Sequence, residues 1–220
     1  MPSRLRLVFA SIAKIRLKKE RNLPGSRQHA PHALPHTIGL VRHYPVQLPL
    51  RPRRCDAEQF AGWCDRYNSA AVKLPAFPSV GATEWDACLS SDMRRAVATA
   101  QHIYGEKGGI VFTNKLREIE LAPFWNTRLR LPLLLWAAVA RAAWYASHQS
   151  QPESKKQART RAAALADQLM RYGGEKRVLL VSHGAFLLVL QRELRRRGYR
   201  GPRIMHASHG KPYIMKRAVG

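Results

Sequence analysis

The chain has 220 residues, of which 45% are apolar, so it can bury one substantial core, and we expect one globular domain. Its 38 Lys and Arg residues against 14 Asp and Glu give a formal charge of +24 at pH 7, which attracts phosphorylated small molecules, polyanions and anionic membrane surfaces alike. Three cysteines without Cys-x-x-Cys spacing argue against a disulfide framework or a zinc knuckle, and we expect reduced thiols.

The first 36 residues are predicted to form a basic leader, and residues 37–220 the domain. The leader carries eight Lys or Arg side chains and one acid, Glu20, with apolar residues at near-helical spacing. This pattern is compatible with a transit sequence, a helix on a membrane surface, an arm for an acidic partner or a poorly ordered tail. We expect a cytoplasmic location, with a transit function of the leader as the alternative.

Short apolar runs and helical patterns alternate after the leader. Residues 37–41 predict a buried strand, with Arg42 and His43 at its carboxyl end. Residues 110–112 and 178–181 predict two more strands, and the latter runs directly into His183. Helices are predicted over residues 56–72 with Asp56 as N-cap, 92–104, 131–148, 154–172 and 185–196. The apolar run at 131–146 is shorter than the ~20 residues that span a bilayer, so we expect no transmembrane segment.

Strands that alternate with helices predict an α/β fold. We expect three layers, with a mostly parallel central sheet and helices on both faces. In such sheets ligands bind in the crevice at the carboxyl ends of the strands. Two of the predicted strands deliver a histidine to that edge, His43 and His183.

Four short stretches, in order along the chain, resemble the signatures of the histidine phosphatase (phosphoglycerate mutase-like) superfamily. The first ends in Arg42-His43 and is similar to the family's Arg-His signature. Residues 90–100, Ser-Ser-Asp-Met-Arg-Arg-Ala-Val-Ala-Thr-Ala, resemble its second signature. Residues 116–118, Leu-Arg-Glu, and 181–184, Val-Ser-His-Gly, resemble its Leu-x-Glu and its final histidine motif. The resemblance covers the chain after the leader and implies a phosphatase-type member.

The chemistry of these residue types agrees with the resemblance. A neutral imidazole can attack phosphorus and hold the group as phosphohistidine, and His43 is the candidate nucleophile. Negative charge spreads over the phosphoryl oxygens, and guanidinium groups bind such oxygens bidentately, which suits Arg42 and Arg95. The family pattern implies that His183 is a further donor to the phosphoryl group.

A leaving alkoxide needs a proton, and the water that later attacks phosphohistidine must lose one, so one carboxyl group can serve both steps. Glu118 is the candidate because of the Leu-x-Glu spacing. Glu120 would face the same side in an extended segment, so it stays the alternative.

Two departures from the family pattern concern the substrate. Tyr44 and Pro45 follow His43 where the family usually has glycine. Tyr44 is therefore a candidate substrate-binding residue at the pocket mouth, with a packed aromatic ring as the alternative. Ala122 and Pro123 replace the usual glycine after the Leu-x-Glu motif, which makes a mutase less expected than a hydrolase.

The sequence therefore predicts a phosphomonoester hydrolase that needs neither a cofactor nor a metal and acts on a phosphorylated small molecule or a phosphoprotein. A mutase-like phosphotransferase and a basic phosphate-binding or polyanion-binding protein with lapsed catalysis are the alternatives. Nucleic acid is not an expected partner, contact of the leader with a membrane surface is compatible with its pattern, and the oligomeric state is left open. His206 and His209 have a spacing that suits a metal, but no cysteine or acid accompanies them, so we expect no metal site.

Overall fold

The structure is a computed structural model that describes residues 35–48, 52–78, 80, 85–105, 108–174 and 176–217. Nearly all of the predicted basic leader lies outside these residues, so its roles stay predictions.

In the described residues the α helices are α2 (Ala57–Ser69), α3 (Arg94–Tyr104), α4 (Leu133–Tyr145), α5 (Lys155–Leu169) and α6 (Gly184–Arg196). The strands are β1 (Thr37–Arg42), β2 (Arg54–Cys55), β3 (Ala87–Ser91), β4 (Ile110–Thr113), β5 (Leu131–Pro132), β6 (Arg177–Ser182), β7 (Tyr199–Arg200) and β8 (Pro212–Arg217).

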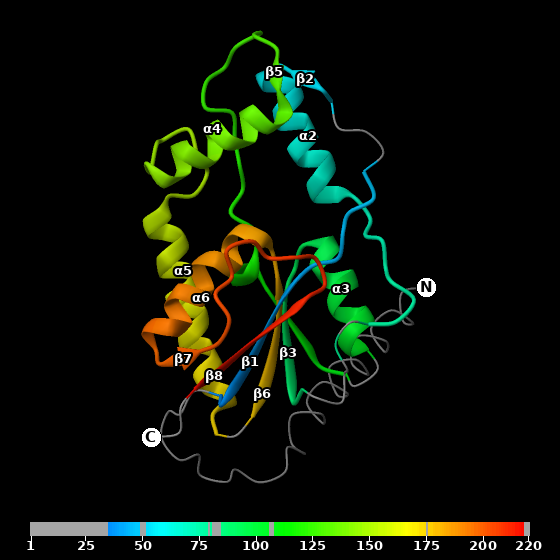
Figure 1. Cartoon of the computed structure of the whole chain (residues 1–220), viewed down its shortest axis with the longest axis vertical. Helices are drawn as coiled ribbons and strands as arrows, with labels where there is room; N and C mark the ends of the chain where they lie inside the picture. Colours follow the sequence, from blue (N-terminus) through cyan, green and yellow to red (C-terminus); the bar gives the residue numbers. More distant parts are fainter. Residues whose placement is uncertain are drawn as a thin grey trace, which may run out of the picture. The chain divides into compact units, whose positions relative to one another are not determined.

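The central sheet has six strands in the order β4-β3-β6-β1-β8-β7. The first four are parallel to one another, and β8 pairs antiparallel with both of its neighbours. Helix α3 covers one face of the sheet, and α5 and α6 cover the other (Figure 1). The predicted three-layer α/β fold with a mostly parallel sheet is confirmed.

Alternate residues of the central strands pack against opposite helical layers. Leu40 and Leu180 belong to a buried cluster that includes residues of α5 and α6. Their chain neighbours Val41 and Val181 belong to a second cluster that includes residues of α3. Successive side chains of a strand point to opposite faces, so a strand covered on both faces is apolar at nearly every position. This explains the continuous apolar runs in the sequence.

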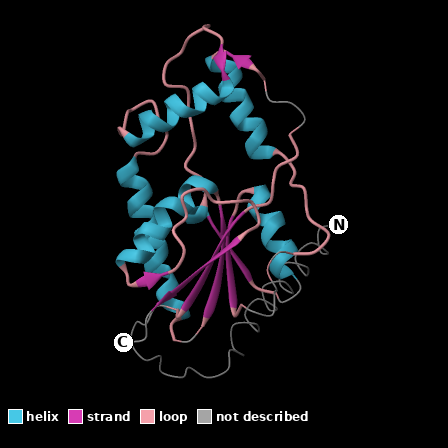
Figure 2. Cartoon of the chain, in the orientation of Figure 1, coloured by secondary structure: helices cyan, strands magenta, loops and turns pink. Residues whose placement is uncertain are grey.

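Helices α2 and α4, with the short strands β2 and β5, lie beyond the carboxyl ends of the parallel strands (Figure 2). They have their own buried cluster, in which Phe60 of α2 stacks on Trp136 of α4 with ring centroids 5.7 Å apart. Trp136 also donates from Nε1 to the Cys55 carbonyl at 2.8 Å. The core of this covering layer therefore depends on a few aromatic contacts.

Several predicted boundaries shift, and strands β2, β3, β5, β7 and β8 were not predicted. The residues of β3 end in two serines, so the segment lacks the apolar alternation by which a strand is recognised. Helix α3 begins at Arg94 and not at Asp92, because the backbone of Met93, its N-cap, is extended. The Asp92 carboxylate forms a bidentate pair with Arg117 at 2.7 Å. Asp56 does cap α2, and its side chain and that of Gln59 form a capping box.

The helix predicted over residues 131–148 is α4, which is shorter at both ends, and the one predicted over 154–172 is α5 followed by a 3-10 turn, η4 (Met170–Tyr172). Among the described residues, every helix is too short or too polar to cross a bilayer. The three cysteines are free thiols.

Gly39 in β1 is required by a close approach of Trp85. A Cβ atom at position 39 would lie 2.3 Å from Cη2 of the Trp85 ring, and Trp85 is buried, so the ring has no room to move away. Gly39→Ala should lower the free energy of unfolding by about 1–3 kcal/mol through overpacking, measured by urea denaturation. Gly62→Ala in α2 is the control, because its Cβ meets only Arg66 Nη1 at 3.4 Å; it should raise stability by up to about 1 kcal/mol. Equal stability of the two variants would contradict the prediction.

Candidate active site

The carboxyl ends of β1 and β6 place two histidines side by side. Their parallel register pairs Arg42 with Ser182, and the backbone N–H of His43 donates to the Ser182 carbonyl at 2.9 Å. His43 and His183 therefore leave the sheet together, and their ring centroids are 5.1 Å apart. The structure thus brings the two predicted imidazoles close enough to contact one phosphoryl group.

Arg95 connects the two imidazoles. Its Nε donates a shared hydrogen bond to Nε2 of His43 and to Nδ1 of His183, each at 3.2 Å. Its Nη1 donates to the side chain of Asn68 at 3.1 Å and to the Asn68 carbonyl at 3.3 Å, while within the described part of the chain Nη2 reaches only the Met93 sulfur at 3.6 Å. Arg95 is 1% exposed, so this cation is buried and held by polar partners on two of its three nitrogens.

The hydrogen bonds of His43 determine its tautomer. Its Nδ1 lies 2.7 Å from the Tyr44 carbonyl, and a carbonyl can only accept, so Nδ1 carries the proton. Nε2 then holds a lone pair. Burial, followed by the Arg95 charge, lowers the pKa of His43 to about 2 although the Tyr44 carbonyl opposes the shift. At neutral pH the ring is therefore uncharged and its Nε2 is nucleophilic.

His183 is the opposite tautomer. Its Nδ1 accepts from Arg95, so the proton is on Nε2, which donates to Ser91 Oγ at 2.9 Å. Burial and then the Arg95 charge hold the pKa of His183 well below its usual range. His183 thus reaches the site as a neutral imidazole with one donor. Ser91, from the second of the signature stretches, accepts from His183 and from the Met93 backbone N–H.

Glu118 lies at the N-terminus of α6. Its Oε1 accepts from the backbone N–H groups of Ile119 at 2.9 Å and Phe186 at 3.1 Å, and its Oε2 accepts from Ala185 at 3.3 Å. A carboxylate in this position satisfies free N–H groups of the helix and interacts favourably with its dipole. Glu118 is therefore held at the first turn of α6, and the N-cap residue of this helix is His183.

Arg42 packs against the start of the same helix. A Cβ at Gly184 would lie 3.3 Å from Arg42 Cζ, so glycine at 184 leaves room for the guanidinium group. Arg42 Nη1 donates to the Ala207 carbonyl at 2.9 Å, while its buried Nε has no hydrogen-bond partner among the described residues. Arg42 also contributes to lowering the pKa of His43, so its positive charge acts on the site.

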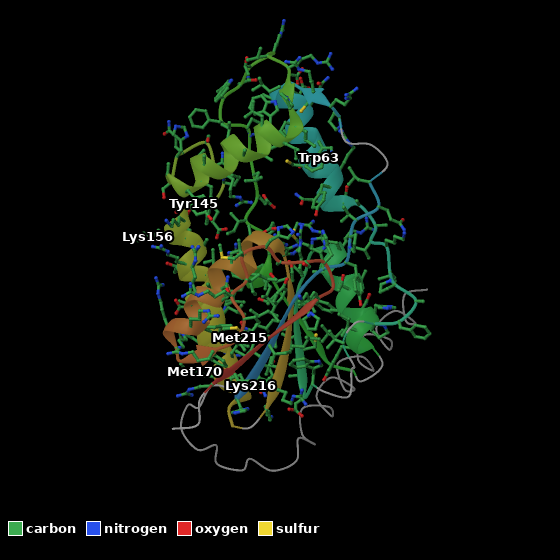
Figure 3. All side chains as sticks on the ribbon, in the orientation of Figure 1. Trp63, Tyr145, Lys156, Met170, Met215 and Lys216 are labelled. Carbon is green, nitrogen blue, oxygen red and sulfur yellow. The ribbon has the colours of Figure 1, made fainter. Side chains whose placement is uncertain are left out.

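A cleft with a volume of about 340 Å³ reaches two residues of this group, while Arg42, His43 and His183 are not among the residues that line it. Arg95 and Glu118 line it, and Glu120, the alternative acid, lines it as well. The rest of its wall comes from α2, the segment that follows Glu118, and Arg141 of α4; Trp63, one of the α2 residues, is labelled in Figure 3. The parallel strands end below this wall, so the cleft lies at the edge where α/β sheets bind ligands.

Tyr44 does not line this cleft. Its side chain is buried in the cluster of α3, its ring meets His102 edge to face at 5.5 Å, and its hydroxyl has no partner among the described residues. Its backbone N–H donates to Thr99 Oγ1 at 2.9 Å. This environment is that of a packed aromatic ring. The contribution of Tyr44 to the site is its backbone carbonyl, which fixes the His43 tautomer. A role of Tyr44 in substrate binding stays a prediction.

Sequence reasoning missed three neighbours of the site, Tyr67, Asn68 and His209. The guanidinium carbon of Arg95 lies 5.2 Å from the centre of the Tyr67 ring, and Asn68 accepts from Arg95. His209 donates from Nδ1 to the His43 carbonyl at 2.7 Å, with ring centroids 5.1 Å apart. The amphipathic pattern of α2 is the sequence signal that could have placed Tyr67 and Asn68, and the pairing of β8 with β1 is the one that could have placed His209.

The described residues hold no group of three His, Cys, Asp or Glu suited to a metal ion.

The comparison with protein families gives a match to the histidine phosphatase superfamily (branch 1) over residues 75–217. The chain belongs to this superfamily. The matched range contains Arg95, Glu118 and His183, while Arg42 and His43 precede it. No curated protein matches the chain at a significant level.

Solved structures show the same fold. A putative alpha-ribazole-5'-P phosphatase from Escherichia coli is 15% identical, with a TM-score of 0.53 over 81% of this chain and 89% of that one. A mycobacterial glucosyl-3-phosphoglycerate phosphatase, solved with VO3, is 18% identical, with a TM-score of 0.51 over 81% of this chain and 92% of that one. Membership of the superfamily supports phosphatase activity in general.

His209 is expected to position the backbone of His43, the predicted nucleophile. In His209→Ala the His43 carbonyl loses its donor, and kcat for phosphomonoester hydrolysis should fall about tenfold, the effect of one buried hydrogen bond. His209→Asn places an amide N–H near the position of Nδ1 and should recover most of the rate. Steady-state kinetics and thermal unfolding of both variants check this. If the asparagine variant is as slow as the alanine variant while both stay folded, the hydrogen bond is not what matters.

Proposed function

We propose that the protein is a phosphomonoester hydrolase that acts through phosphohistidine on His43 without a metal. The observation that carries the proposal is the neutral His43 ring with its Nε2 lone pair directed at Arg95, beside a second neutral imidazole. A nucleophile for phosphorus needs a lone pair at neutral pH, and burial supplies it here by preventing protonation. Superfamily membership supports the same chemistry.

In the first half-reaction, Nε2 of His43 attacks phosphorus, an N–P bond forms, and the bond between phosphorus and the leaving oxygen breaks. The imidazole then carries positive charge, which the Tyr44 carbonyl stabilises by accepting from Nδ1–H. The leaving oxygen takes a proton from a carboxylic acid, for which Glu118 is the candidate. The same group accepts a proton from water in the second half-reaction, when the N–P bond breaks and inorganic phosphate leaves.

Arg95 is suited to bind the phosphoryl oxygens. Among the residues that the structure describes, its Nη2 contacts only a sulfur atom, a weak acceptor, and its Nε bonds to the two imidazoles are long for a charged donor. Charged phosphoryl oxygens are stronger acceptors than either, so a bound substrate gains from replacing these contacts. Arg42 adds a second positive charge, and no described residue accepts from its Nε.

The nucleophile is tested by mutation and by trapping. Purified protein, assayed in chelator with p-nitrophenyl phosphate and a panel of phosphorylated metabolites, should hydrolyse at least one compound. His43→Ala should reduce turnover at least about 10⁴-fold, as removal of a nucleophile does. Rapid quench in alkaline detergent should trap a phosphoenzyme whose label resists alkali and is lost on later exposure to acid, as an N–P bond requires.

His148→Ala, at an exposed histidine beyond α4, is the control and should retain full activity. Hydrolysis that persists in His43→Ala would refute His43 as the nucleophile, and loss of activity in chelator would refute metal independence. A phosphoenzyme that transfers its group to an acceptor faster than to water would instead establish a phosphotransferase.

The acid is tested by the dependence on the leaving group. Glu118→Gln should slow hydrolysis of an alkyl phosphate by about 10²- to 10⁴-fold, because an alkoxide must be protonated as it leaves. The first half-reaction of p-nitrophenyl phosphate, measured as the burst of p-nitrophenolate, should slow much less, since its phenolate leaves without a proton. Steady-state turnover of both substrates should also fall, because Glu118 accepts a proton from water in the second half-reaction. Glu120→Gln, on the same cleft, is the matched control and should affect both substrates little. The reverse pattern in the two variants would assign the acid to Glu120, and equal losses on both substrates in the first half-reaction would contradict Glu118 as the acid.

A further inference from the structure

Helix α4 of the covering layer (Figure 1) is apolar on its outer side as well as on its inner side. The inner side packs on α2 through the buried Trp136. On the outer side, Leu134 is 73% exposed, Leu135 45% and Tyr145 46%. All exposed residues of the helix are apolar or aromatic: Leu134, Leu135, Ala138, Ala142 and Tyr145. They follow the helical period and therefore form one continuous face, which we call the α4 face.

A face of this kind normally has an occupant. A helix that is apolar all round is usually covered on all sides, and contiguous apolar patches mark surfaces that bind a protein or a membrane. Because the five residues of the α4 face are exposed, no segment within the described part of the chain covers them. The occupant must be sought from the chemistry that surrounds the face.

Arginines surround the end at which α4 begins. Strand β2 pairs with β5, and Arg53, Arg54 and Arg130 line one hollow there. Leu129, which is 57% exposed, lines the same hollow. Arg128 is exposed beside it in the chain. This end of the α4 face thus combines an exposed aliphatic side chain with several positive charges.

The far end of the α4 face is basic as well. Nζ of Lys155, the first residue of α5, lies 5.6 Å from the centre of the Tyr145 ring, and Lys156 follows it; Tyr145 and Lys156 are labelled in Figure 3. Lysine and tyrosine both carry an apolar body and a polar tip, so they suit a boundary between hydrocarbon and water.

Acidic residues are scarce around the α4 face. Residues 121–152 contain neither Asp nor Glu. The acids nearest to β2 in the chain are Asp56 and Glu58, and the Asp56 side chain is engaged in the capping box of α2. Glu153, which precedes α5, is paired with Arg161 at 2.6 Å. The apolar face is therefore rimmed by positive charge.

We propose that the α4 face rests on the surface of an anionic lipid membrane. The leucines enter the boundary between head groups and acyl chains, while the arginines beside β2 and β5 and the lysines of α5 reach the lipid phosphates. This inference goes beyond the proposed function and does not depend on it.

Charge decides between this occupant and others. A second copy of the chain would bring the same cations against the face, and the basic leader, with eight Lys or Arg and one acid, would be repelled by the rim in the same way. A nucleic acid would satisfy the cations but leave the leucines in water. An anionic bilayer satisfies both, because it has phosphates at its surface and hydrocarbon directly beneath them.

Binding of the full chain to vesicles tests the proposal. The wild type should sediment with sucrose-loaded vesicles of phosphatidylcholine that contain about 30% phosphatidylserine, and much less with phosphatidylcholine alone. Salt should weaken the binding by screening. The double variant Leu134→Ser/Leu135→Ser should lower the partition coefficient by about tenfold or more, because it removes apolar area that the membrane covers.

Two further variants complete this measurement. Arg53→Gln/Arg130→Gln should also lower the partition coefficient by about tenfold, since each cation is attracted to the anionic surface. Phe77→Ser is the matched control, because Phe77 is 85% exposed but lies outside the α4 face, and it should bind as the wild type does. The substituted side chains are all at the surface, so the thermal unfolding midpoints should stay close to that of the wild type.

The position of the contact is measured separately, because the basic leader also attracts anionic vesicles. Leu134→Trp and Phe77→Trp each add one fluorophore to the full chain, and their emission is compared with that of the wild type on vesicles with brominated acyl chains. The emission added by Leu134→Trp should be quenched, and that added by Phe77→Trp should not.

Several results would overturn the proposal. A wild type that stays in solution beside anionic vesicles would do so, as would unchanged binding by Leu134→Ser/Leu135→Ser or unquenched emission from Leu134→Trp. A wild type that is dimeric in sedimentation equilibrium, with a monomeric Leu134→Ser/Leu135→Ser variant, would show that a second copy covers the face. Duplex oligonucleotides that displace the wild type and this variant equally from vesicles would assign the cations to a nucleic acid. None of these measurements involves turnover, so their failure leaves the phosphatase proposal intact.

Discussion

The arrangement of the site depends on one hydrogen bond, which Arg95 Nε shares between His43 and His183. The shared donor requires a lone pair on each imidazole nitrogen that faces it, so it selects one tautomer at His43 and the other at His183. The same positive charge disfavours protonation of both rings and adds to the effect of burial in lowering both pKa values. A buried guanidinium group thereby keeps two histidines neutral, which is the protonation state a nucleophile for phosphorus needs.

A cation at this depth needs support from outside the sheet. Asn68 accepts from Arg95, and Tyr67 offers its ring to the same guanidinium group, so the end of α2 becomes part of the site. Helix α2 is in turn packed on α4 through Phe60 and Trp136. The covering layer therefore does two things: it forms the wall of the cleft, and it supplies the polar partners without which Arg95 would be a costly buried charge.

The charge of the whole chain and that of the cleft have opposite signs. The chain has a formal charge of +24, a field that raises the local concentration of any anion. The residues that line the cleft include more carboxylates than guanidinium groups. Attraction at long range is thus unselective, while the cleft itself limits how much negative charge a ligand can bring. Selectivity for a small phosphorylated compound over a polyanion would follow from this contrast.

The sequence by itself determined the fold class and the strand ends that carry His43 and His183, because a strand buried on both faces leaves a continuous apolar run that is readable without a structure. It also determined the candidates Arg42, Arg95 and Glu118, through spacing within short motifs that resemble a known family. Only the tertiary structure decided which nitrogen of each histidine holds the proton. The position of each proton depends on Arg95, which lies 52 residues from His43 and 88 residues from His183 in the chain, and at His43 also on the Tyr44 carbonyl. It also decided that His209 reaches His43, that Glu118 caps α6 and that Arg141 lines the same cleft as Glu118. Contacts between distant segments follow from how strands pair and layers pack, and they leave no periodic pattern in the sequence.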